Sequence, residues 1–431
     1  MFALLIYRLL FLLLLPLLIA ALLLRSRTNY QYRQRLAERI GFISKPVKKG
    51  GIIIHAASVG EVIALSPFVN QLLQSHPELP ITLTTFTPTG SIQVQKTFGI
   101  KVQHSYLPLD LFPCTQLFLS RLQPKLMIFM ETELWPNMIQ QCANKRIKLL
   151  LINARLSQNS ITRYQKLRPL IEPTLNCFNK ILCQSEESFQ RFLFLGGTRA
   201  RCEVSGNLKF DLCTNTSINT KIVSLKKLLP ENRQIWLVAS THDGDENIAL
   251  AAFSQIKQKL PKLLLVLVPR HPERFQLVAQ LCQAKGFNLV KRSDNIPVIN
   301  QDIWLLDTLG ELMPAYALAS IVTMGGSFSD IGGHNPLEPA LFKKPIVVGN
   351  DMSNFSEVLT QLQQQEGIVQ LTSTTDPKEQ AEMLAIAVLS LLQNSEQAIV
   401  LGLNAYQVVI ENQGASKRTL AAVEGLLNET S

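Results

Sequence analysis

Short apolar runs recur along residues 51–211, and stretches with the length and spacing of helices separate most of them. Buried strands of a parallel sheet have this apolar character, because helices cover both faces of such a sheet. The pattern therefore predicts a parallel sheet with strands at 52–55, 81–86, 102–106, 126–130, 148–153, 181–183 and 202–204.

A second series of apolar runs follows a polar stretch, 212–232, that is rich in Thr, Asn, Ser and Lys. We interpret this stretch as a linker between an N-terminal domain, 51–211, and a C-terminal domain, 233–431. An alternative for the last helix of the chain is that it packs back on the first domain. Strands of the second domain are expected at 235–239, 263–268, 303–306, 321–324 and 346–348.

Two Rossmann-like, doubly wound α/β domains that face each other across a cleft are the simplest architecture for this alternation. Ligands of such sheets bind outside the carboxyl ends of the strands. The loops that follow predicted strands are therefore the places to search for chemistry.

The N-terminus has a different pattern. Residues 9–24 are apolar and uncharged, close to the lower limit of about 17 residues for a membrane span. No small-x-small cleavage site follows, so we predict an uncleaved membrane anchor, 1–24, in preference to a signal peptide. The next segment, 25–50, carries eight basic residues and the single acid Glu38. This charge places the following domains on the cytoplasmic side and predicts contact with anionic membrane lipid.

Composition supports a folded, two-domain protein. Of the 431 residues, 47% are hydrophobic and 17% are charged, which is enough apolar material for sizeable cores. The net charge of +10 raises the alternative of a nucleic-acid partner, but we find no recognition motif for one. The seven cysteines include no C-x-x-C pair, so neither a disulfide framework nor a zinc site is expected, and a reducing compartment is favoured.

Glu61 is the first candidate for chemistry. It lies in a loop of small residues between the first predicted strand and a helix expected at 62–73. Ser58 and Glu61 have the spacing of a capping box, in which the Glu61 carboxylate would bond back to the Ser58 amide. Alternatively, the carboxylate acts as a general base. The sequence leaves both interpretations open.

Two more candidates follow strands of the first domain. Glu131 comes directly after the strand 126–130, where a carboxylate either complements a helix N-terminus or takes part in chemistry. Lys209 stands beside a Gly-Asn turn at the end of the domain. A lysine in such a loop can reach a phosphate or a carboxylate.

The second domain has the features of a nucleotide site. Arg270 follows a buried strand, and a Gly-Gly pair precedes Asn335, Pro336 and Glu338. Asn335 suits an N-cap and Pro336 suits the first position of a helix. Free amides at this helix start would bind a phosphate, and Glu338, one turn later, could accept hydrogen bonds from ribose hydroxyls.

Neither a metal nor a cofactor is expected. Asp243 and Asp245 form an Asp-x-Asp pair, but they open a helix, where acids are favoured, and a divalent cation needs more oxygen ligands. Walker and G-x-G-x-x-G loops are missing, which disfavours an ATPase or a dinucleotide dehydrogenase.

Nine segments between residues 53 and 340, taken in order, resemble the 3-deoxy-D-manno-octulosonic acid (Kdo) transferases of lipid A biosynthesis. They are HAASVGE, TFTPTG, METELWPN, INARLS, SGNLKFD, STHDGDE, PRHPERF, DTLGEL and GGSFSDIGGHNPLEPA. The resemblance covers nearly the whole chain. STHDGDE is its loosest segment.

The resemblance implies a GT-B fold, the donor CMP-Kdo, a tetraacylated lipid A precursor as acceptor, and inversion of the anomeric carbon without a metal. It also implies an enzyme anchored in the cell inner membrane. Glu61 would be the catalytic base, and Glu131 and Lys209 would stabilise the transition state. The residues implied for CMP binding are Pro269, Arg270, Gly310, Glu311, Leu312, Asn335, Pro336, Leu337 and Glu338.

Two alternatives remain. A GT-B transferase that uses a UDP-sugar would share the glycine-rich loop and the ribose-binding acid, and protection by UDP instead of CMP would identify it. A secreted two-lobed binding protein would lose its N-terminus near Ala21, and the mature N-terminus would identify it.

Overall fold

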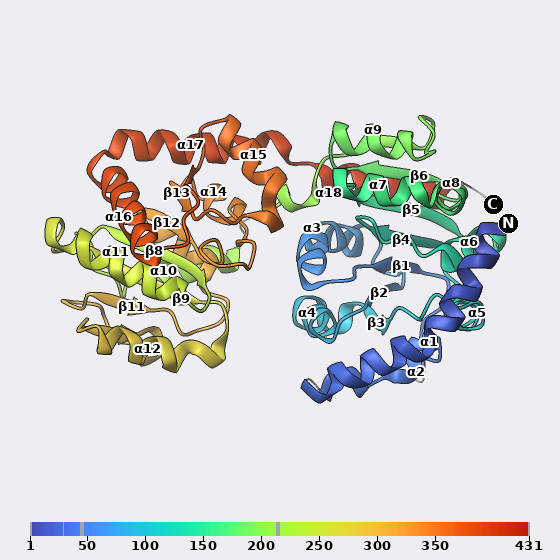
Figure 1. Ribbon diagram of the computed structural model, residues 1–431, viewed down its shortest axis with the longest axis horizontal. Helices are drawn as coiled ribbons and strands as arrows, with labels where there is room; N and C mark the ends of the chain where they lie inside the picture. The colour runs from blue at the N-terminus through green and yellow to red at the C-terminus, as the bar shows by residue number, and fades with distance from the viewer. Residues whose placement is uncertain (1, 29, 44–46, 213–215, 430–431) are drawn as a thin grey trace. The chain divides into compact units, whose positions relative to one another are not determined.

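The computed structural model describes residues 2–28, 30–43, 47–212 and 216–429. Its contacts divide the chain into a first unit, Met1–Asp211 with Asn412–Ser431, and a second unit, Leu212–Glu411. Within the described residues, each unit contains one seven-stranded parallel sheet with helices packed against it (Figure 1). The predicted α/β class with two parallel sheets is therefore confirmed.

The sheet of the first unit has the strand order β3-β2-β1-β4-β5-β6-β7. Ile52 and Ile54 of β1 belong to the core on one face, and Ile53 belongs to the core on the other. Burial on both faces explains the unbroken apolar runs in the sequence. The strands are β1 (Ile52–His55), β2 (Ile81–Thr85), β3 (Gln103–Tyr106), β4 (Leu126–Met130), β5 (Lys148–Ala154), β6 (Lys180–Cys183) and β7 (Cys202–Val204).

Helices precede, connect and follow these strands. The α-helices are α1 (Phe2–Thr28), α2 (Leu36–Arg39), α3 (Val59–Ser75), α4 (Pro88–Phe98), α5 (Phe112–Leu122), α6 (Pro136–Asn144), α7 (Gln158–Lys166), α8 (Arg168–Leu175), α9 (Glu186–Phe194) and α18 (Ala415–Asn428). Short 3₁₀ turns are η1 (Tyr30–Arg33), η2 (Gly99–Lys101) and η3 (Leu208–Phe210).

The sheet of the second unit has the order β10-β11-β9-β8-β12-β13-β14. Its strands are β8 (Ile235–Thr241), β9 (Leu264–Pro269), β10 (Leu289–Lys291), β11 (Ile303–Leu305), β12 (Ile321–Met324), β13 (Ile346–Val348) and β14 (Val369–Gln370). Its helices are α10 (Thr216–Lys226), α11 (Asp245–Lys259), α12 (Phe275–Ala284), α13 (Leu312–Leu318), α14 (Leu337–Leu341), α15 (Ser356–Gln364), α16 (Pro377–Gln393) and α17 (Ser395–Asn412), with 3₁₀ turns η4 (Pro272–Arg274), η5 (Arg292–Asp294) and η6 (Ser353–Phe355).

The sequence prediction missed β10 and β14. Both lie at an edge of the second sheet and span only three and two residues. Strands this short carry no periodic pattern, so only pairing with β11 and β13 reveals them.

The expected linker, 212–232, contains the helix α10, which packs against α13 of the second unit. Residues 213–215 of this stretch lie outside the described part of the chain. At its other end the chain returns to the first unit, where α18 packs against α3 (Figure 1).

The N-terminal helix α1 contacts the first unit through two polar side chains. The Tyr7 hydroxyl donates to Asp110 at 2.9 Å, and Nε of Arg8 donates to Oδ1 of Asn137 at 2.6 Å. Among the described residues, no single helix is both long and apolar enough to cross a membrane, and Phe2–Leu17 forms a shorter apolar stretch. A bent helix pair, Pro377–Gln393 with Ser395–Asn428, passes that test by length and composition alone.

The basic segment after α1 is only partly available to a membrane. Arg35 forms an ion pair with Glu38 at 2.7 Å, and Arg39 is 2% exposed. Arg39 is therefore not available for the predicted contact with membrane lipid, because its guanidinium lies over the rings of Phe86 and Tyr106. Lys45 lies outside the described residues.

Candidate active site

Glu61 lies in the first turn of α3, beyond the carboxyl end of β1. Ser58 is the N-cap of this helix, and its hydroxyl accepts a hydrogen bond from the Glu61 amide at 3.4 Å. The Glu61 carboxylate accepts hydrogen bonds from the Ala57 amide at 2.9 Å and from the Ser58 hydroxyl at 2.7 Å. The bond expected from the Ser58 amide thus comes from the residue before it. These bonds hold the carboxylate in one place, so capping and chemistry are compatible.

The electrostatic environment of Glu61 favours its protonated form. Burial raises its pKa from 4.5 to about 7, and the charge of Glu131 adds to the rise, whereas the bonds from Ser58 and Ala57 oppose it. A carboxyl group that titrates near neutral pH can both accept and release a proton there, which suits a general base.

Glu131 and Glu133 stand in the loop between β4 and α6. Glu131 has a φ of 57°, a left-handed conformation that is uncommon for a residue with a side chain. It also lies outside the first turn of α6, so helix complementarity does not account for it. Oε2 of Glu133 lies 3.7 Å from Nε2 of the buried His55 and accepts a hydrogen bond from the Trp135 indole at 2.9 Å. These contacts hold the loop against β1.

Lys209 lies in the turn η3 at the end of the first sheet. The Lys209 amide donates to Asn207 at 3.0 Å, and the amide of Leu208 donates to Asn153 of β5 at 2.9 Å. Because η3 packs against α3, the structure brings the turn of Lys209 to the helix that carries Glu61.

In the second unit, Arg270 lies close enough to Glu338 for its charge to act on the Glu338 carboxyl. Pro269 ends β9, and the amide of Arg270 donates to the Thr241 carbonyl at 3.0 Å. Burial raises the pKa of Glu338 to about 7, while a hydrogen bond from Tyr316 and the charge of Arg270 oppose the rise. A guanidinium and a hydrogen-bonded carboxyl therefore share this part of the second unit.

The helix start at Leu337 follows the sequence prediction with a shift of one residue. Oδ1 of Asn335 accepts a hydrogen bond from the Leu337 amide at 3.1 Å, as a capping side chain would. Pro336, expected at the first helical position, occupies the N-cap of α14 instead. This helix has only five residues, so its dipole is small.

The segment 310–312 lies at the start of α13. The Gly310 carbonyl accepts a hydrogen bond from Nζ of Lys221 at 2.9 Å, and Glu311 pairs with Arg292 at 3.1 Å. One turn further along, α13 carries Tyr316, the partner of Glu338, and α13 packs against α14.

The Asp243 and Asp245 side chains have structural partners. Asp243 is exposed and lies 3.2 Å from Arg274. Oδ2 of Asp245 accepts hydrogen bonds from the amides of His242 at 2.8 Å and Gly326 at 2.6 Å. In the described residues, no three or more His, Cys, Asp or Glu side chains are grouped so as to hold a metal ion.

Sequence reasoning missed a histidine pair beside Arg270. Nε2 of His242 lies 2.8 Å from Nε2 of His334, and the two rings are stacked at 5.0 Å. Burial, together with the charges of His242, Arg270 and His271, lowers the pKa of His334 to about 3. One neutral ring must therefore donate its N–H to the other. The two residues come from separate loops, so the spacing of residues in the sequence gives no indication of this contact.

The sequence is similar to proteins of one family. Residues 34–212 match the family model described as 3-deoxy-D-manno-octulosonic-acid transferase. A 3-deoxy-D-manno-octulosonic acid transferase of Haemophilus influenzae is 44% identical over 409 residues, which cover 94% of each chain.

Two solved structures are also similar. The C-terminal CMP-Kdo binding domain of WaaA from Acinetobacter baumannii is 30% identical and covers 45% of this chain and 99% of its own, with a TM-score of 0.40. UDP-GlcNAc 2-epimerase from Neisseria meningitidis is 15% identical and covers 87% of this chain and all of its own, with a TM-score of 0.57, a likeness of fold alone. From the match to the Haemophilus protein along nearly its whole length, the chain belongs to the 3-deoxy-D-manno-octulosonic acid transferases, a family of glycosyltransferases.

Proposed function

We propose that this chain transfers Kdo from CMP-Kdo to a tetraacylated lipid A precursor in lipopolysaccharide biosynthesis, by an inverting reaction that needs no metal. Family membership supports the sugar, since a transferase of this name is 44% identical along nearly the whole chain. The observation that carries the mechanism is the Glu61 carboxyl, which is held by two hydrogen bonds and has a pKa of about 7.

Glu61 is the general base in this mechanism. Its ionised carboxylate takes the proton of an acceptor hydroxyl while that oxygen forms a bond to the anomeric carbon of Kdo. The bond from the anomeric carbon to the phosphate oxygen breaks, and CMP leaves with that electron pair. A single displacement inverts the carbon, because the nucleophile enters opposite to the leaving group.

The other charged residues assigned to this reaction stabilise charges on the donor and form no covalent bond to it. Arg270 pairs with the phosphate of CMP and stabilises the charge that develops on it. Lys209 pairs with the carboxylate of Kdo, and Glu131 favours the positive charge that develops on the sugar ring. The remaining donor contacts come from Pro269, 310–312 and Asn335–Glu338, the segments that the resemblance to Kdo transferases implies for CMP binding.

The acceptor is amphiphilic, so we also propose that the chain works at the cytoplasmic face of the inner membrane with α1 as its anchor. Phe2, Leu13 and Leu17 of α1 expose 76%, 73% and 66% of their surfaces. A row of large apolar side chains exposed to water is unfavourable, and insertion into lipid removes that surface from water.

A direct transfer assay tests the proposal. Pure protein is incubated with CMP-Kdo and the tetraacylated precursor, and the product is identified by mass spectrometry. We expect the acceptor mass to rise by whole Kdo units, and CMP, but not UDP, to protect the protein from thermal unfolding. Protection by UDP alone, with no gain in acceptor mass, would replace this function with transfer from a UDP-sugar.

A further inference from the structure

The first unit contains a cavity that the proposed reaction does not use. Its volume is about 350 Å³, near the lower end of the roughly 300–1,000 Å³ typical of ligand pockets. Its walls come from α1, from the segment 32–40 that includes α2, and from the loop between β3 and α5. The apolar side chains among them are Leu15, Leu36, Ile40, Leu109 and Leu111.

Arg39 lines this cavity and has two buried N–H groups without a hydrogen-bond partner. Nη2 donates to the Phe86 carbonyl at 3.0 Å, but Nε and Nη1 are buried without a hydrogen-bond partner. The guanidinium lies 5.1 Å from the centre of the Phe86 ring and 4.5 Å from that of Tyr106. Buried guanidinium N–H groups nearly always have acceptors. The two unpaired groups therefore indicate that an oxygen acceptor binds here.

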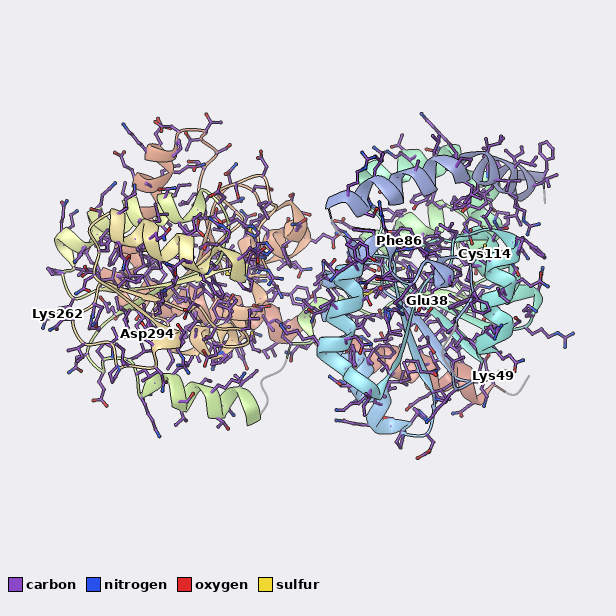
Figure 2. All side chains as sticks on the ribbon, turned by 90° about the horizontal axis from the view of Figure 1, so that it is seen from below. Glu38, Lys49, Phe86, Cys114, Lys262 and Asp294 are labelled. Carbon is purple, nitrogen blue, oxygen red and sulfur yellow. The ribbon has the colours of Figure 1, made fainter. Side chains whose placement is uncertain are left out.

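A short path of hydrogen bonds joins Arg39 to the proposed base. The Phe86 carbonyl accepts from Arg39, and the Phe86 amide donates to the Ala57 carbonyl at 3.4 Å. The Ala57 amide donates in turn to Glu61. Figure 2 labels three residues around Arg39 in the first unit. Phe86 accepts its hydrogen bond, Glu38 precedes it in the sequence, and Cys114 lines the same cavity. Phe86 and Ala57 thus connect Arg39 of the cavity wall to Glu61 through hydrogen bonds.

The rim of the cavity suits a lipid. Leu36 and Ile40 expose 43% and 55% of their surfaces, although both are large apolar residues beside exposed basic side chains such as Arg33. Apolar walls with a cationic wall residue fit a molecule that has a hydrocarbon chain and an acidic head. The size of the cavity limits the occupant to one chain.

We propose that this cavity receives one acyl chain of the lipid acceptor, with the unpaired N–H groups of Arg39 bonded to a phosphate oxygen of the acceptor's head group. The proposal rests on the proposed function, because it assigns a subsite to the same acceptor. It explains how the first unit can hold an acceptor hydroxyl at Glu61 while most of the acceptor stays in the membrane.

Photolabelling of the full-length protein tests the subsite. The probe is the tetraacylated precursor with a diazirine on an acyl chain, and labelled peptides are identified by mass spectrometry. We expect labels on peptides that contain residues 32–40 and 107–114. Excess unlabelled precursor should prevent this labelling, whereas its deacylated form and phosphatidylglycerol should not. Absence of labels from 32–40 and 107–114, or equal competition by phosphatidylglycerol, would overturn the proposal.

A cavity-filling variant gives a second readout. Leu36→Trp places an indole at the rim and should reduce labelling and raise the KM for the precursor by about tenfold, the effect of losing roughly two buried methylene groups. Ile100→Trp, a matched change at an exposed position before β3, should alter neither. Arg39→Lys should weaken labelling further while thermal protection by CMP persists. Unchanged labelling in Leu36→Trp contradicts the subsite, whereas wild-type labelling without any Kdo transfer contradicts the proposed function instead.

Discussion

Glu131 lies close enough to Glu61 for its charge to raise the pKa of the Glu61 carboxyl, and it does so from a left-handed backbone position with φ 57°. Such a conformation costs free energy in a residue with a side chain and persists only where the surroundings enforce it. Here the Glu131 amide bonds to the Ile152 carbonyl at 2.9 Å, and the neighbouring Glu133 is held by His55 and Trp135. Two acids are thus kept near one another in the first unit.

Glu61→Gln separates the base from the cap. We expect turnover to fall by about 10²–10⁴-fold, because an amide cannot take a proton from the acceptor. Below pH 4.5, where Glu61 is protonated in the folded and the unfolded state, the unfolding free energy should change by less than about 1 kcal/mol, since Gln retains an oxygen for the Ala57 amide. Turnover, melting temperature and CMP affinity are measured on one preparation.

Ser58→Ala is the control for this change. It removes the N-cap oxygen and should cost about 0.5–2 kcal/mol of stability, with a smaller loss of turnover than in Glu61→Gln. Wild-type turnover in Glu61→Gln would leave Glu61 as a cap only and move the base to Glu131.

The pH dependence of kcat/KM should report the Glu61 pKa. The base must be ionised, so kcat/KM should decline as the pH falls below about 7, the pKa to which burial and Glu131 raise the group. Glu131→Gln removes one of these causes and should move the acidic limb to lower pH. A limb that stays in place would mean that the titrating group is not coupled to Glu131.

The pH dependence of the unfolding free energy should also report the titration of Glu61. The folded-state pKa of Glu61 lies above its unfolded value of 4.5, so the protonated form favours folding. This contribution is present below pH 4.5 and is lost as the pH rises towards about 7. Relative to Glu61→Gln, the wild-type protein should therefore lose stability over that interval in denaturant titrations. Parallel pH profiles would contradict the raised pKa.

Activity should be unaffected by excess EDTA. One carboxylate oxygen of Asp245 accepts hydrogen bonds from two backbone amides, and Asp243 is exposed beside Arg274. The phosphate of CMP is assigned to Arg270 in the proposed mechanism, so no metal is needed to bind it. Transfer rates are compared in EDTA and in magnesium. A strict need for magnesium, restored by titration, would make Asp243 and Asp245 ligands after all.

Asp211→Ala should loosen the return of the chain to the first unit. The Asp211 carboxylate accepts hydrogen bonds from the amides of Gly414 and Ser416 at the start of α18. Loss of these charge-assisted bonds should cost about 1–3 kcal/mol and speed proteolysis near residue 412. Asp376→Ala, which removes the N-cap of α16 in the second unit, is the matched control and should not expose that site. Equal cleavage in the two variants would show that Asp211 does not hold α18.

Deletion of residues 1–24 should release the enzyme from membranes and leave the sheet of the first unit folded. Asp110 loses Tyr7 but keeps the amides of Asn137 and Met138 at 2.9 and 2.8 Å. Residual binding to anionic vesicles should weaken as salt is added, because exposed basic residues of 25–50 would carry it. Vesicle flotation at two salt concentrations measures this, and binding that ignores salt would exclude the basic segment as a second contact.

The local pattern of the sequence determined most of the strands and one feature of the site. Strands buried on both faces must be apolar along their length, so runs such as 126–130 are visible without a structure. A capping contact spans three residues, so the relation between Ser58 and Glu61 was visible too. The nine segments that resemble Kdo transferases identified the family, because their order along the chain needs no coordinates.

Tertiary structure alone decided the contacts between distant segments. The pairing of His242 with His334, and the burial of Arg39 against Phe86 and Tyr106, depend on which loops the two sheets bring together. Arginine in a basic run is normally exposed, so the sequence predicted a membrane contact where the fold places a buried charge. The short edge strands β10 and β14 were missed for the same reason: their stability comes from neighbours far along the chain, and no local pattern records those neighbours.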